Sequence, residues 1–400
     1  NMIMKNIILF DTESLHLELL PLTFTRPISD IRFGIFTIRE KWEQMYPGNY
    51  SYKTNDYLAK KYPLQTDDNN YFIAGNVCPD KELIQELDKL SEQESLFYND
   101  ELIAFYGTLD AFQENDFGVV HPLKNEPLSL RKLYDIFINN NIALERDYKI
   151  ITSKKQSAPL PASNRVIGNP NFEDGTPKIF IEPGASIECV TLNVTQGPIY
   201  IGKDAEIMEN SSIRAPFAAC EHVVVNMGTK IYGATTLGPY CKVGGELNNV
   251  IMQAYSNKGH DGFLGNAVIG EWCNLGAGTN ASNLKNDYSE IKLWNYPSRR
   301  FLRTGLQFCG LIMGDHSKAG INCMFNTATV LGVGVNVHGS GFPRNFVASF
   351  SEGGTAGFSD VPLSRFFSIA ERMMARRGKV LTEVDRAIFE AIHDETENLK

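Results

Sequence analysis

The chain has 400 residues, of which 43% are hydrophobic, and its formal net charge is −9. That length suffices for two or three domains with buried cores. The acidic balance excludes a general nucleic-acid binder, which would show a basic face, although a few well-placed cations still suffice for a small phosphorylated ligand. The seven cysteines are scattered without a C-x-x-C pair, so reduced thiols in a cytoplasmic protein are the simplest interpretation.

Strand and helix signals alternate over the first 152 residues. Residues 5–10 predict a buried strand and residues 71–74 another, whereas residues 31–46, 80–90 and 128–139 carry helical patterns. This alternation predicts an α/β domain over residues 1–152. The apolar run at residues 7–10 is too short for a signal peptide or a membrane span, so no membrane segment is expected. Residues 153–165 are polar and rich in proline, which is typical of a linker.

A six-residue period dominates the next part of the chain. Aliphatic residues or alanine recur at this spacing eight times running: Ile201, Ile207, Ile213, Ala219, Val225, Ile231, Leu237 and Val243. No α-helix has this period, and an ordinary half-buried strand has a period of two. A strict hexad is typical of a parallel β-helix, in which each repeat places one short strand on one wall. Residues 166–358 are therefore predicted to form a parallel β-helix.

The hexad resumes in new phases after interruptions near residues 244–262 and 282–312. The resumed runs are Phe263, Ile269, Leu275 and Ala281, and then Met313, Ala319, Phe325, Leu331 and Val337. Each change of phase implies an inserted loop, and binding groups concentrate in such loops. Residues 359–400 are expected to form a C-terminal helical segment, with helices over 363–377 and 382–393.

Motifs in the β-helix resemble one segment of a known bifunctional enzyme family. They are Ser-Asn-Lys-Gly-His at 256–260, Phe-Leu-Gly-Asn-Ala-Val-Ile-Gly at 263–270, Asn-Leu-Gly-Ala-Gly-Thr at 274–279, and Asn283. The family is the N-acetylglucosamine-1-phosphate uridylyltransferase that is also a glucosamine-1-phosphate N-acetyltransferase, and the layout is similar to an alternative bacterial branch of sugar-1-phosphate nucleotidyltransferases. The resemblance implies a left-handed β-helix, acetyl-CoA as cofactor, and a homotrimer.

The resemblance also implies roles for individual residues of the β-helix. His260 matches the general base of the family, and a histidine suits the removal of a proton from an ammonium near neutral pH. Asn274 and Asn283 match residues that bind substrate or cofactor, although asparagine is also common at the corners of such coils. Arg214 and Lys258 are candidates for holding a sugar phosphate, with solvated surface charge as the alternative.

Two further features bear on the ligands. The family has a tyrosine where this chain has Phe263, and a lysine where it has a neutral residue near Asn248, which bears on the identity of the amino sugar. Four basic residues near the C-terminus would either meet the phosphates of CoA or form a solvated helix face. They are Arg372, Arg376, Arg377 and Lys379.

The N-terminal motif Leu-Pro-Leu-Thr-Phe-Thr-Arg-Pro at 20–27 resembles the end of the signature of sugar-1-phosphate nucleotidyltransferases. The Gly-rich phosphate loop that precedes it in the family is replaced by residues 11–16. The resemblance implies that Arg26 and Asn76 bind nucleotide, Asn76 standing where the family has a metal-binding aspartate. Asp80 and Asp147 are the candidate ligands for Mg²⁺, which prefers carboxylate oxygen.

The leading hypothesis is an acetyl-CoA-dependent N-acetyltransferase acting on an amino-sugar phosphate, fused to a sugar-1-phosphate nucleotidyltransferase domain that lacks its phosphate loop. Its partners would be sugar phosphates and nucleotides, with no nucleic-acid polymer and no membrane. One alternative is nucleotidyl transfer alone, of a thymidylyl or uridylyl group, with the β-helix serving assembly. The other is a scaffold or regulator without catalytic activity.

Overall fold

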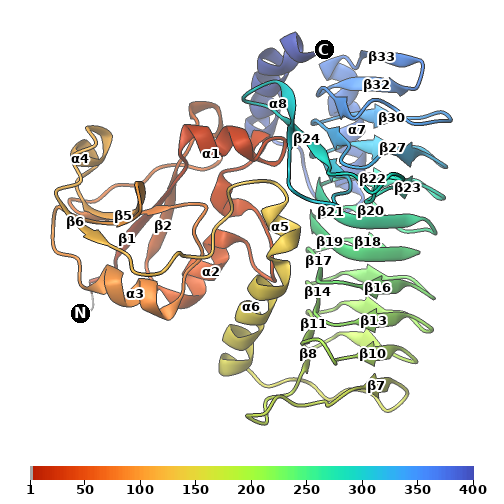
Figure 1. The fold of residues 1–400 in the computed structure, drawn as a ribbon, viewed down its shortest axis with the longest axis horizontal. Coiled ribbons are helices and arrows are strands. Elements are labelled where there is room, and N and C mark those ends of the chain that lie inside the picture. Colours follow the sequence, from red (N-terminus) through yellow and green to blue (C-terminus); the bar gives the residue numbers. More distant parts are fainter. Residues whose placement is uncertain (1–2) are drawn as a thin grey trace. The chain divides into compact units, whose positions relative to one another are not determined.

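The computed structural model describes residues 3–400 (Figure 1). The chain forms two compact units. The N-terminal unit comprises the residues up to Leu19, Thr25–Ile31 and Phe36–Lys132, and the C-terminal unit comprises Leu20–Phe24, Arg32–Ile35 and Leu133–Lys400. The helices that close the expected first domain, up to residue 152, therefore belong by their contacts to the C-terminal unit.

The N-terminal unit is built on a mixed six-stranded sheet in the order β2-β1-β3-β5-β4-β6. Its strands are β1 (Asn6–Phe10), β2 (Asn49–Lys53), β3 (Asn70–Ala74), β4 (Glu94–Tyr98), β5 (Glu101–Gly107) and β6 (Val119–Pro122). β1 runs parallel to both of its neighbours, and Ile7 and Ile8 on it are fully buried. A central parallel strand is covered on both faces, which explains its continuous apolar run.

The helices of this unit are short. They are α1 (Glu13–Glu18), η2 (Ile28–Asp30), α2 (Ile38–Met45), η3 (Asp56–Leu58), α3 (Lys81–Asp88) and α4 (Leu109–Gln113). α3 confirms the helix predicted over 80–90. The helix predicted from residue 31 begins only at Ile38, because Gly34 has a positive φ of 75° and Thr37 forms a capping box with Glu40.

The C-terminal unit opens with η1 (Leu22–Phe24), α5 (Asp135–Ile138) and α6 (Asn140–Lys154). The prediction of one helix over 128–139 was wrong, because most of the helical turns lie further along the chain in α6. Asn140 Nδ2 donates to Ala234 O at 3.0 Å, and Tyr148 Oη donates to Pro177 O at 2.5 Å. These contacts with the strand region explain why α6 belongs to this unit.

The rest of the unit is a parallel β-helix whose strands form three walls (Figure 1). Wall 1 contains β7 (Arg165–Ile167), β10 (Thr191–Asn193), β13 (Ser212–Arg214), β16 (Lys230–Tyr232), β23 (Asn280–Ala281) and β28 (Met324–Phe325). Wall 2 contains β8 (Ile179–Ile181), β11 (Ile199–Ile201), β14 (Phe217–Ala219), β17 (Thr235–Leu237), β26 (Ile312–Met313), β29 (Val330–Leu331) and β31 (Phe346–Val347).

Wall 3 contains β9 (Ser186–Ile187), β12 (Glu206–Ile207), β15 (Val224–Val225), β18 (Lys242–Val243), β20 (Asn257–Lys258), β22 (Asn274–Leu275), β27 (Lys318–Ala319), β30 (Asn336–Val337) and β32 (Ser351–Gly354). β33 (Gly357–Asp360) pairs antiparallel with β32 at the end of this wall. The long strands β19 (Glu246–Ala254) and β21 (Phe263–Glu271) pass from wall 1 to wall 2. They turn this corner at Asn249 and Asn266, which have positive φ.

The hexad prediction is confirmed in detail. The eight residues of the main run are at most 1% exposed, and they fall on walls 2, 3 and 1 in turn. One resumed position was wrong: Leu264 rather than Phe263 points inward, because Leu264 pairs with Leu247 across β21 and β19. The next residue of the predicted run, Ile269, follows Leu264 after five residues, so the six-residue count fails at this corner.

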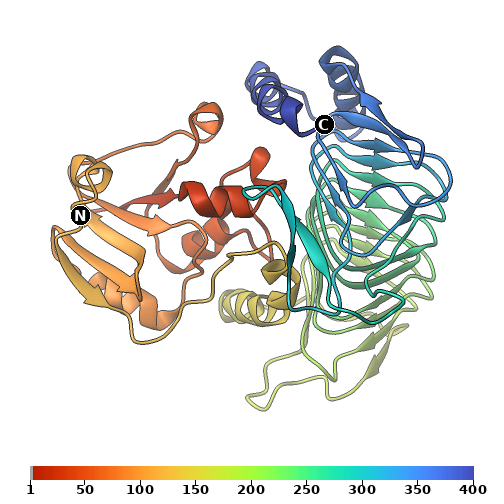
Figure 2. The ribbon, with the colours of Figure 1, turned by 45° about the horizontal axis from the view of Figure 1, so that its top comes forward.

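The second insertion forms a hairpin of β24 (Lys292–Asn295) and β25 (Arg300–Arg303). The chain ends in α7 (Leu363–Ala375), α8 (Glu383–Thr396) and η4 (Glu397–Leu399), and α7 and α8 confirm the two predicted C-terminal helices. Figure 2 shows α7 and α8 beside the last coils of the β-helix.

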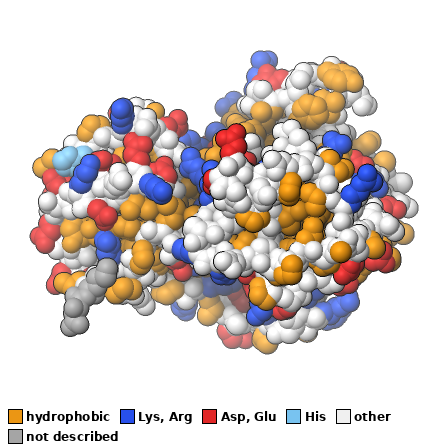
Figure 3. All heavy atoms as spheres, turned by 90° about the horizontal axis from the view of Figure 1, so that it is seen from below, with side chains coloured by type: hydrophobic (Ala, Val, Ile, Leu, Met, Phe, Trp, Pro, Cys, Tyr) orange, Lys and Arg blue, Asp and Glu red, His pale blue; other side chains and the backbone are white. Residues whose placement is uncertain are grey.

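Among the described residues, no helix combines the length and the apolar character needed to cross a membrane. On the face shown in Figure 3, basic side chains are scattered among acidic ones rather than gathered in one stripe.

Candidate active site

His260 lies on the turn between β20 and β21, at the corner where wall 3 passes into wall 1. Its side chain is exposed. The preceding coil approaches this turn through Gly244 and Gly245. A Cβ on Gly245 would lie 2.7 Å from His260 O, and one on Gly244 would collide with Gly259 O. Only glycine permits this approach, so the glycine pair sets the position of the turn that carries the histidine.

The residues above and below His260 along this corner are small. Because β15, β18, β20, β22 and β27 pair in register, the second residue after each inward position forms a column along the corner. Successive members of that column are Met227, Gly245, His260, Ala277 and Ile321. Met227 is 64% exposed and Ile321 is 71% exposed. The imidazole therefore stands in a gap between two exposed apolar side chains.

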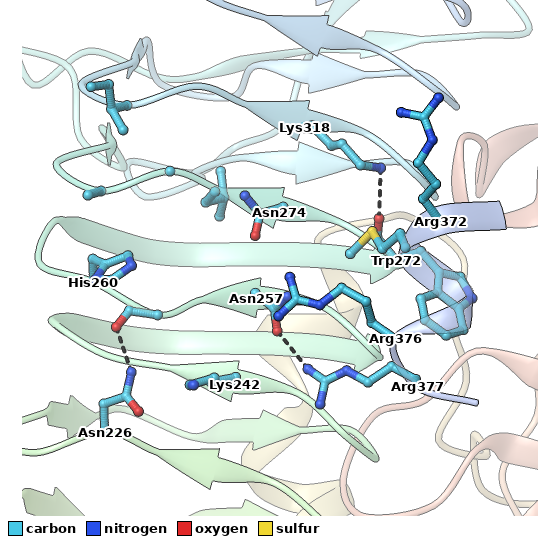
Figure 4. Close-up of a pocket in the computed structure, with 16 residues that line it drawn as sticks. Asn226, Lys242, Asn257, His260, Trp272, Asn274, Lys318, Arg372, Arg376 and Arg377 are labelled. Atoms are coloured by element: carbon cyan, nitrogen blue, oxygen red, sulfur yellow. Dashed lines mark hydrogen bonds between the residues drawn. The ribbon is translucent and has the colours of Figure 1, made fainter. Parts of the chain in front are cut away.

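A cleft with a volume of about 730 Å³ extends from His260 across the outer face of wall 3 to α7. Its cationic lining consists of Lys242, Lys318, Arg372, Arg376 and Arg377, and no carboxylate among residues 3–400 lines it. In Figure 4 the arginines reach over wall 3 from α7, while His260 lies on the opposite side of the view. Arginine and lysine without a competing carboxylate favour an anionic ligand, and forked guanidinium groups suit phosphate.

Two contacts hold the basic side of the cleft in place. Arg377 Nη2 donates to Asn257 Oδ1 at 3.0 Å, which ties the end of α7 to wall 3. Lys318 Nζ donates to the carbonyl oxygens of His316 at 3.1 Å and Trp272 at 3.4 Å. Burial lowers the pKa of Lys318 to about 8, so its charge depends on pH above neutrality.

A second, shallower pocket lies on wall 1, the wall that follows His260. Its volume is about 340 Å³, and Arg214, Lys230, Tyr232 and Glu246 line it. Tyr232 Oη donates to Glu246 Oε2 at 2.6 Å. Glu246 pairs with Phe263, the third residue after His260, so this pocket begins on the coils adjacent to the histidine.

The structure brings two of the sequence-predicted residues of the β-helix together and separates the others. His260 and Asn274 line the same cleft. Asn283 lies instead at the corner of walls 1 and 2, where its Nδ2 donates to Asn266 Oδ1 at 2.8 Å. Asn266 donates in turn to Asn249 Oδ1 at 3.2 Å. Asn283 thus occupies a column of corner asparagines, which agrees with the alternative role that asparagine has in such coils.

Lys258 and Arg214 differ in what they offer to a ligand. Lys258 is 3% exposed and points into the β-helix, where its ammonium donates to backbone carbonyls. Its charge is not presented to a sugar phosphate outside the coil. Arg214 is exposed and lines the pocket on wall 1.

The N-terminal candidates have internal partners. Asn76 is buried and donates to Leu130 O at 3.1 Å, and Arg26 is 3% exposed. Asp80 caps α3 by accepting from Leu83 N at 2.8 Å. Asp147 lies on α6 in the C-terminal unit and accepts from Ile35 N at 2.8 Å. Within residues 3–400, no group of three or more His, Cys, Asp or Glu side chains is arranged to hold a metal ion. Asp80 and Asp147 thus each accept a backbone hydrogen bond within the chain.

Asp11 takes the place of the missing phosphate loop after β1. Its carboxylate accepts from Ile28 N at 3.1 Å and Thr54 Oγ1 at 2.8 Å, and it pairs with the buried His16 at 2.8 Å. The carboxylate of Asp11 thus accepts hydrogen bonds from Ile28 N and Thr54 Oγ1 at the carboxyl end of β1. This end of a strand is where α/β folds bind phosphates.

Sequence reasoning missed several residues of the cleft, among them Asn226, Lys242, Trp272 and Lys318. A signal for two of them was present. Lys242 and Lys318 each precede an inward residue of the hexad and point outward on wall 3, in register with Asn257 and Asn274. Counting back one position from each inward residue would have found this column. The place of α7 over the wall has no such local signal.

The fold and the cleft define a two-part protein: an α/β unit built on a mixed sheet, and a parallel β-helix with a histidine beside a basic cleft. Residues 7–156 match the family model described as sugar nucleotidyl transferase.

Three curated relatives combine both activities or carry a bifunctional name. A bifunctional sugar-1-phosphate nucleotidylyltransferase/acetyltransferase from Sulfurisphaera tokodaii is 31% identical over 130 residues, 32% of each chain. The bifunctional protein GlmU of Methanocaldococcus jannaschii is 32% identical over 87 residues, 22% of this chain and 21% of that protein. GlmU of a Nostoc species is 27% identical over 220 residues, 50% of this chain and 43% of that protein. The chain thus spans less than half the length of each relative. These matches confirm the resemblance to the bifunctional family that the motifs indicated.

Proposed function

We propose that the C-terminal unit is an acetyl-CoA-dependent N-acetyltransferase that acts on an amino-sugar phosphate. The observation that carries this proposal is the exposed His260 at one end of a cleft lined by five cations and no carboxylate. The names of the relatives support the same chemistry. Acetyl-CoA supplies the acetyl group as a thioester and carries several phosphates, which the basic side of the cleft suits.

In this proposal the donor and the acceptor occupy different walls. Arg372, Arg376 and Lys318 would hold the phosphates of CoA over wall 3. Arg214 and Lys230 would hold the phosphate of the amino sugar over wall 1. His260 stands on the corner between the two walls, where it would take the proton that the amine loses as the amide bond forms and return it to the departing thiolate. Asn274 would contact the donor.

Replacement of His260 tests the assignment. His260→Ala should lower the release of CoA from acetyl-CoA and an amino-sugar phosphate by about 10²–10⁴-fold, the usual contribution of a general base. His338→Ala is the matched control, because His338 is exposed at the same corner and does not line the cleft. Unchanged turnover in His260→Ala would discard the assigned base. Absence of CoA binding in the unaltered protein would favour the scaffold alternative.

A second activity, nucleotidyl transfer to a sugar-1-phosphate, is proposed for the N-terminal unit because of its family match. Arg26 and Asn76 would contact the nucleotide. Asp11 already uses donors at the end of β1, so the phosphates of a nucleotide would compete with this carboxylate. We expect nucleotidyl transfer to be weak for that reason. Pyrophosphate release, measured with each of the four NTPs and a panel of sugar-1-phosphates, tests this activity independently of the β-helix.

We also propose a homotrimer in the cytoplasm. Met227 and Ile321 flank His260 along an exposed corner, and apolar side chains so exposed suit a subunit interface. None of the seven cysteines, all of which the structure describes, forms a disulfide, and six of them are buried, which suits a reducing compartment. Light scattering coupled to size exclusion would give the mass of the assembly, and Met227→Lys with Ile321→Lys should dissociate it.

A further inference from the structure

Lys258 occupies a position that the repeat reserves for apolar side chains. Its counterparts on wall 3 are Val225, Val243, Leu275 and Ala319, all of which point into the core. Lys258 points the same way and is 3% exposed. A buried ammonium costs free energy unless it is hydrogen-bonded. An apolar residue would satisfy the core equally well, so the lysine requires a separate explanation.

The ammonium of Lys258 lies under the turn that carries His260. Its Nζ donates to His260 O at 2.9 Å and to Gly244 O at 2.9 Å. The space for it comes from Gly245, because a Cβ there would lie 2.8 Å from the nitrogen. One side chain thus joins the backbone of the histidine to the backbone of the preceding coil.

Two other hydrogen bonds hold the same turn. Asn226 Nδ2 donates to Gly259 O at 2.7 Å, and Gly244 N donates to Lys258 O at 2.7 Å. The carbonyl groups of two successive residues, Gly259 and His260, therefore both accept hydrogen bonds from side chains, those of Asn226 and Lys258. Hydrogen bonds from charged donors are stronger than neutral ones, so the Lys258 contact is the strongest of this set.

We infer that Lys258 is a positioning residue for His260: its buried ammonium ties the histidine turn to the preceding coil and keeps the imidazole at the mouth of the cleft. The kinetic consequence rests on the proposed acetyl transfer, whereas the positioning itself does not. The charged groups that face Lys258 are Asp261 on the same turn, Glu246 on β19 and Lys230 on β16. Burial lowers the pKa of Lys258 to about 8, which the nearby Asp261 and Glu246 partly offset.

Lys258→Met tests the inference, since methionine keeps an unbranched apolar chain in the core and removes only the ammonium. Leu237→Met is the control, because it is a volume-conserving change of an inward residue on wall 2. Hydrogen exchange of the full chain without ligand should show faster exchange at residues 259–262 in Lys258→Met and unchanged exchange in Leu237→Met. The His260 ring resonances should broaden only in Lys258→Met. Unchanged exchange and unchanged ring resonances would overturn the inference.

The kinetic test separates positioning from general stability. In Lys258→Met, kcat for acetyl transfer should fall on the order of tenfold to a hundredfold, while KM for acetyl-CoA stays within about twofold, because a displaced base affects the reaction more than binding. Equal changes in kcat and KM, or none, would overturn the role. If Lys258→Met does not fold, Lys258→Gln, which keeps a shorter donor, replaces it in the same measurements. If the unaltered protein transfers no acetyl group, the proposed function fails, and the exchange experiment still decides the positioning.

Discussion

The glycine pair beside the histidine turn gives a sharp test of how the corner is built. Gly245 has a φ of 72°, and a Cβ there would lie 2.7 Å from His260 O, 2.8 Å from Lys258 Nζ and 2.9 Å from Asp261 Cα. Gly228 belongs to a turn of the same corner and has a φ of 69°, but a Cβ there would meet nothing within 4 Å. Alanine would strain the left-handed backbone at both sites. Only at position 245 would its Cβ also collide with neighbouring atoms.

The magnitudes follow from this difference. A left-handed backbone costs a residue with a Cβ about 1–2 kcal/mol, and both alanine variants should lose this amount of unfolding free energy. Gly245→Ala must also displace backbone atoms of the next coil, which adds about 1–3 kcal/mol. Gly245→Ala should lower acetyl transfer as well, because His260 O and Lys258 Nζ are two of the atoms that must move. Gly228→Ala should leave transfer unchanged.

Urea unfolding followed by circular dichroism measures the free energies, and CoA release measures the transfer. The midpoint of Gly245→Ala should lie below that of Gly228→Ala at an unchanged slope. Equal losses of stability in the two variants, with equal activities, would refute the close approach of the two coils as the structure has it.

Three further predictions concern the cleft and the core. Arg376→Ala should weaken CoA binding about tenfold in calorimetry, because a hydrogen bond from a charged donor is worth about 1.5–3 kcal/mol. Unchanged affinity would mean that the phosphates of CoA bind elsewhere. CoA affinity should fall as pH rises through about 8, where Lys318 loses its proton, and Lys318→Met should lack this fall when titrated between pH 7 and 9. Ile231→Ala should lower the unfolding free energy by about 2–5 kcal/mol, and a loss below 1 kcal/mol would contradict its place in the closed core.

The two lysines with lowered pKa values also set the sign of a stability effect. Burial lowers the pKa of Lys258 and of Lys318 from 10.5 to about 8. Between these two values the unfolded chain binds more protons than the folded chain, so the unfolding free energy should rise with pH across that window. Lys258→Met should remove part of the rise in urea titrations at pH 7.5 and pH 10, and an undiminished rise would contradict the burial of its ammonium.

The period of six determined the β-helix without any knowledge of long-range contacts. Each inward residue repeats the environment of the one six positions earlier, so local spacing alone assigned Ile207, Ile231 and Val243 to a core. The same count failed at Phe263, where the chain crosses a corner in five residues and Leu264 takes the inward place. His260 and Asn274 line one cleft because the motif that contains them spans two neighbouring coils, at wall 3 and at the corner that follows it.

The tertiary structure alone decided what surrounds that motif. Arg372 and Arg376 could equally have faced solvent, since nothing in an amphipathic helix specifies which wall it covers, and only the packing of α7 brings them to the cleft of His260. Asn283 follows the motif closely along the chain, yet the path of the coil places it at another corner. Lys258 resembles a surface cation in sequence, and its burial depends on carbonyl groups supplied by the coil before it. Spacing along a chain determines which residues share a wall, whereas ligand sites depend on segments that meet only after the chain has folded.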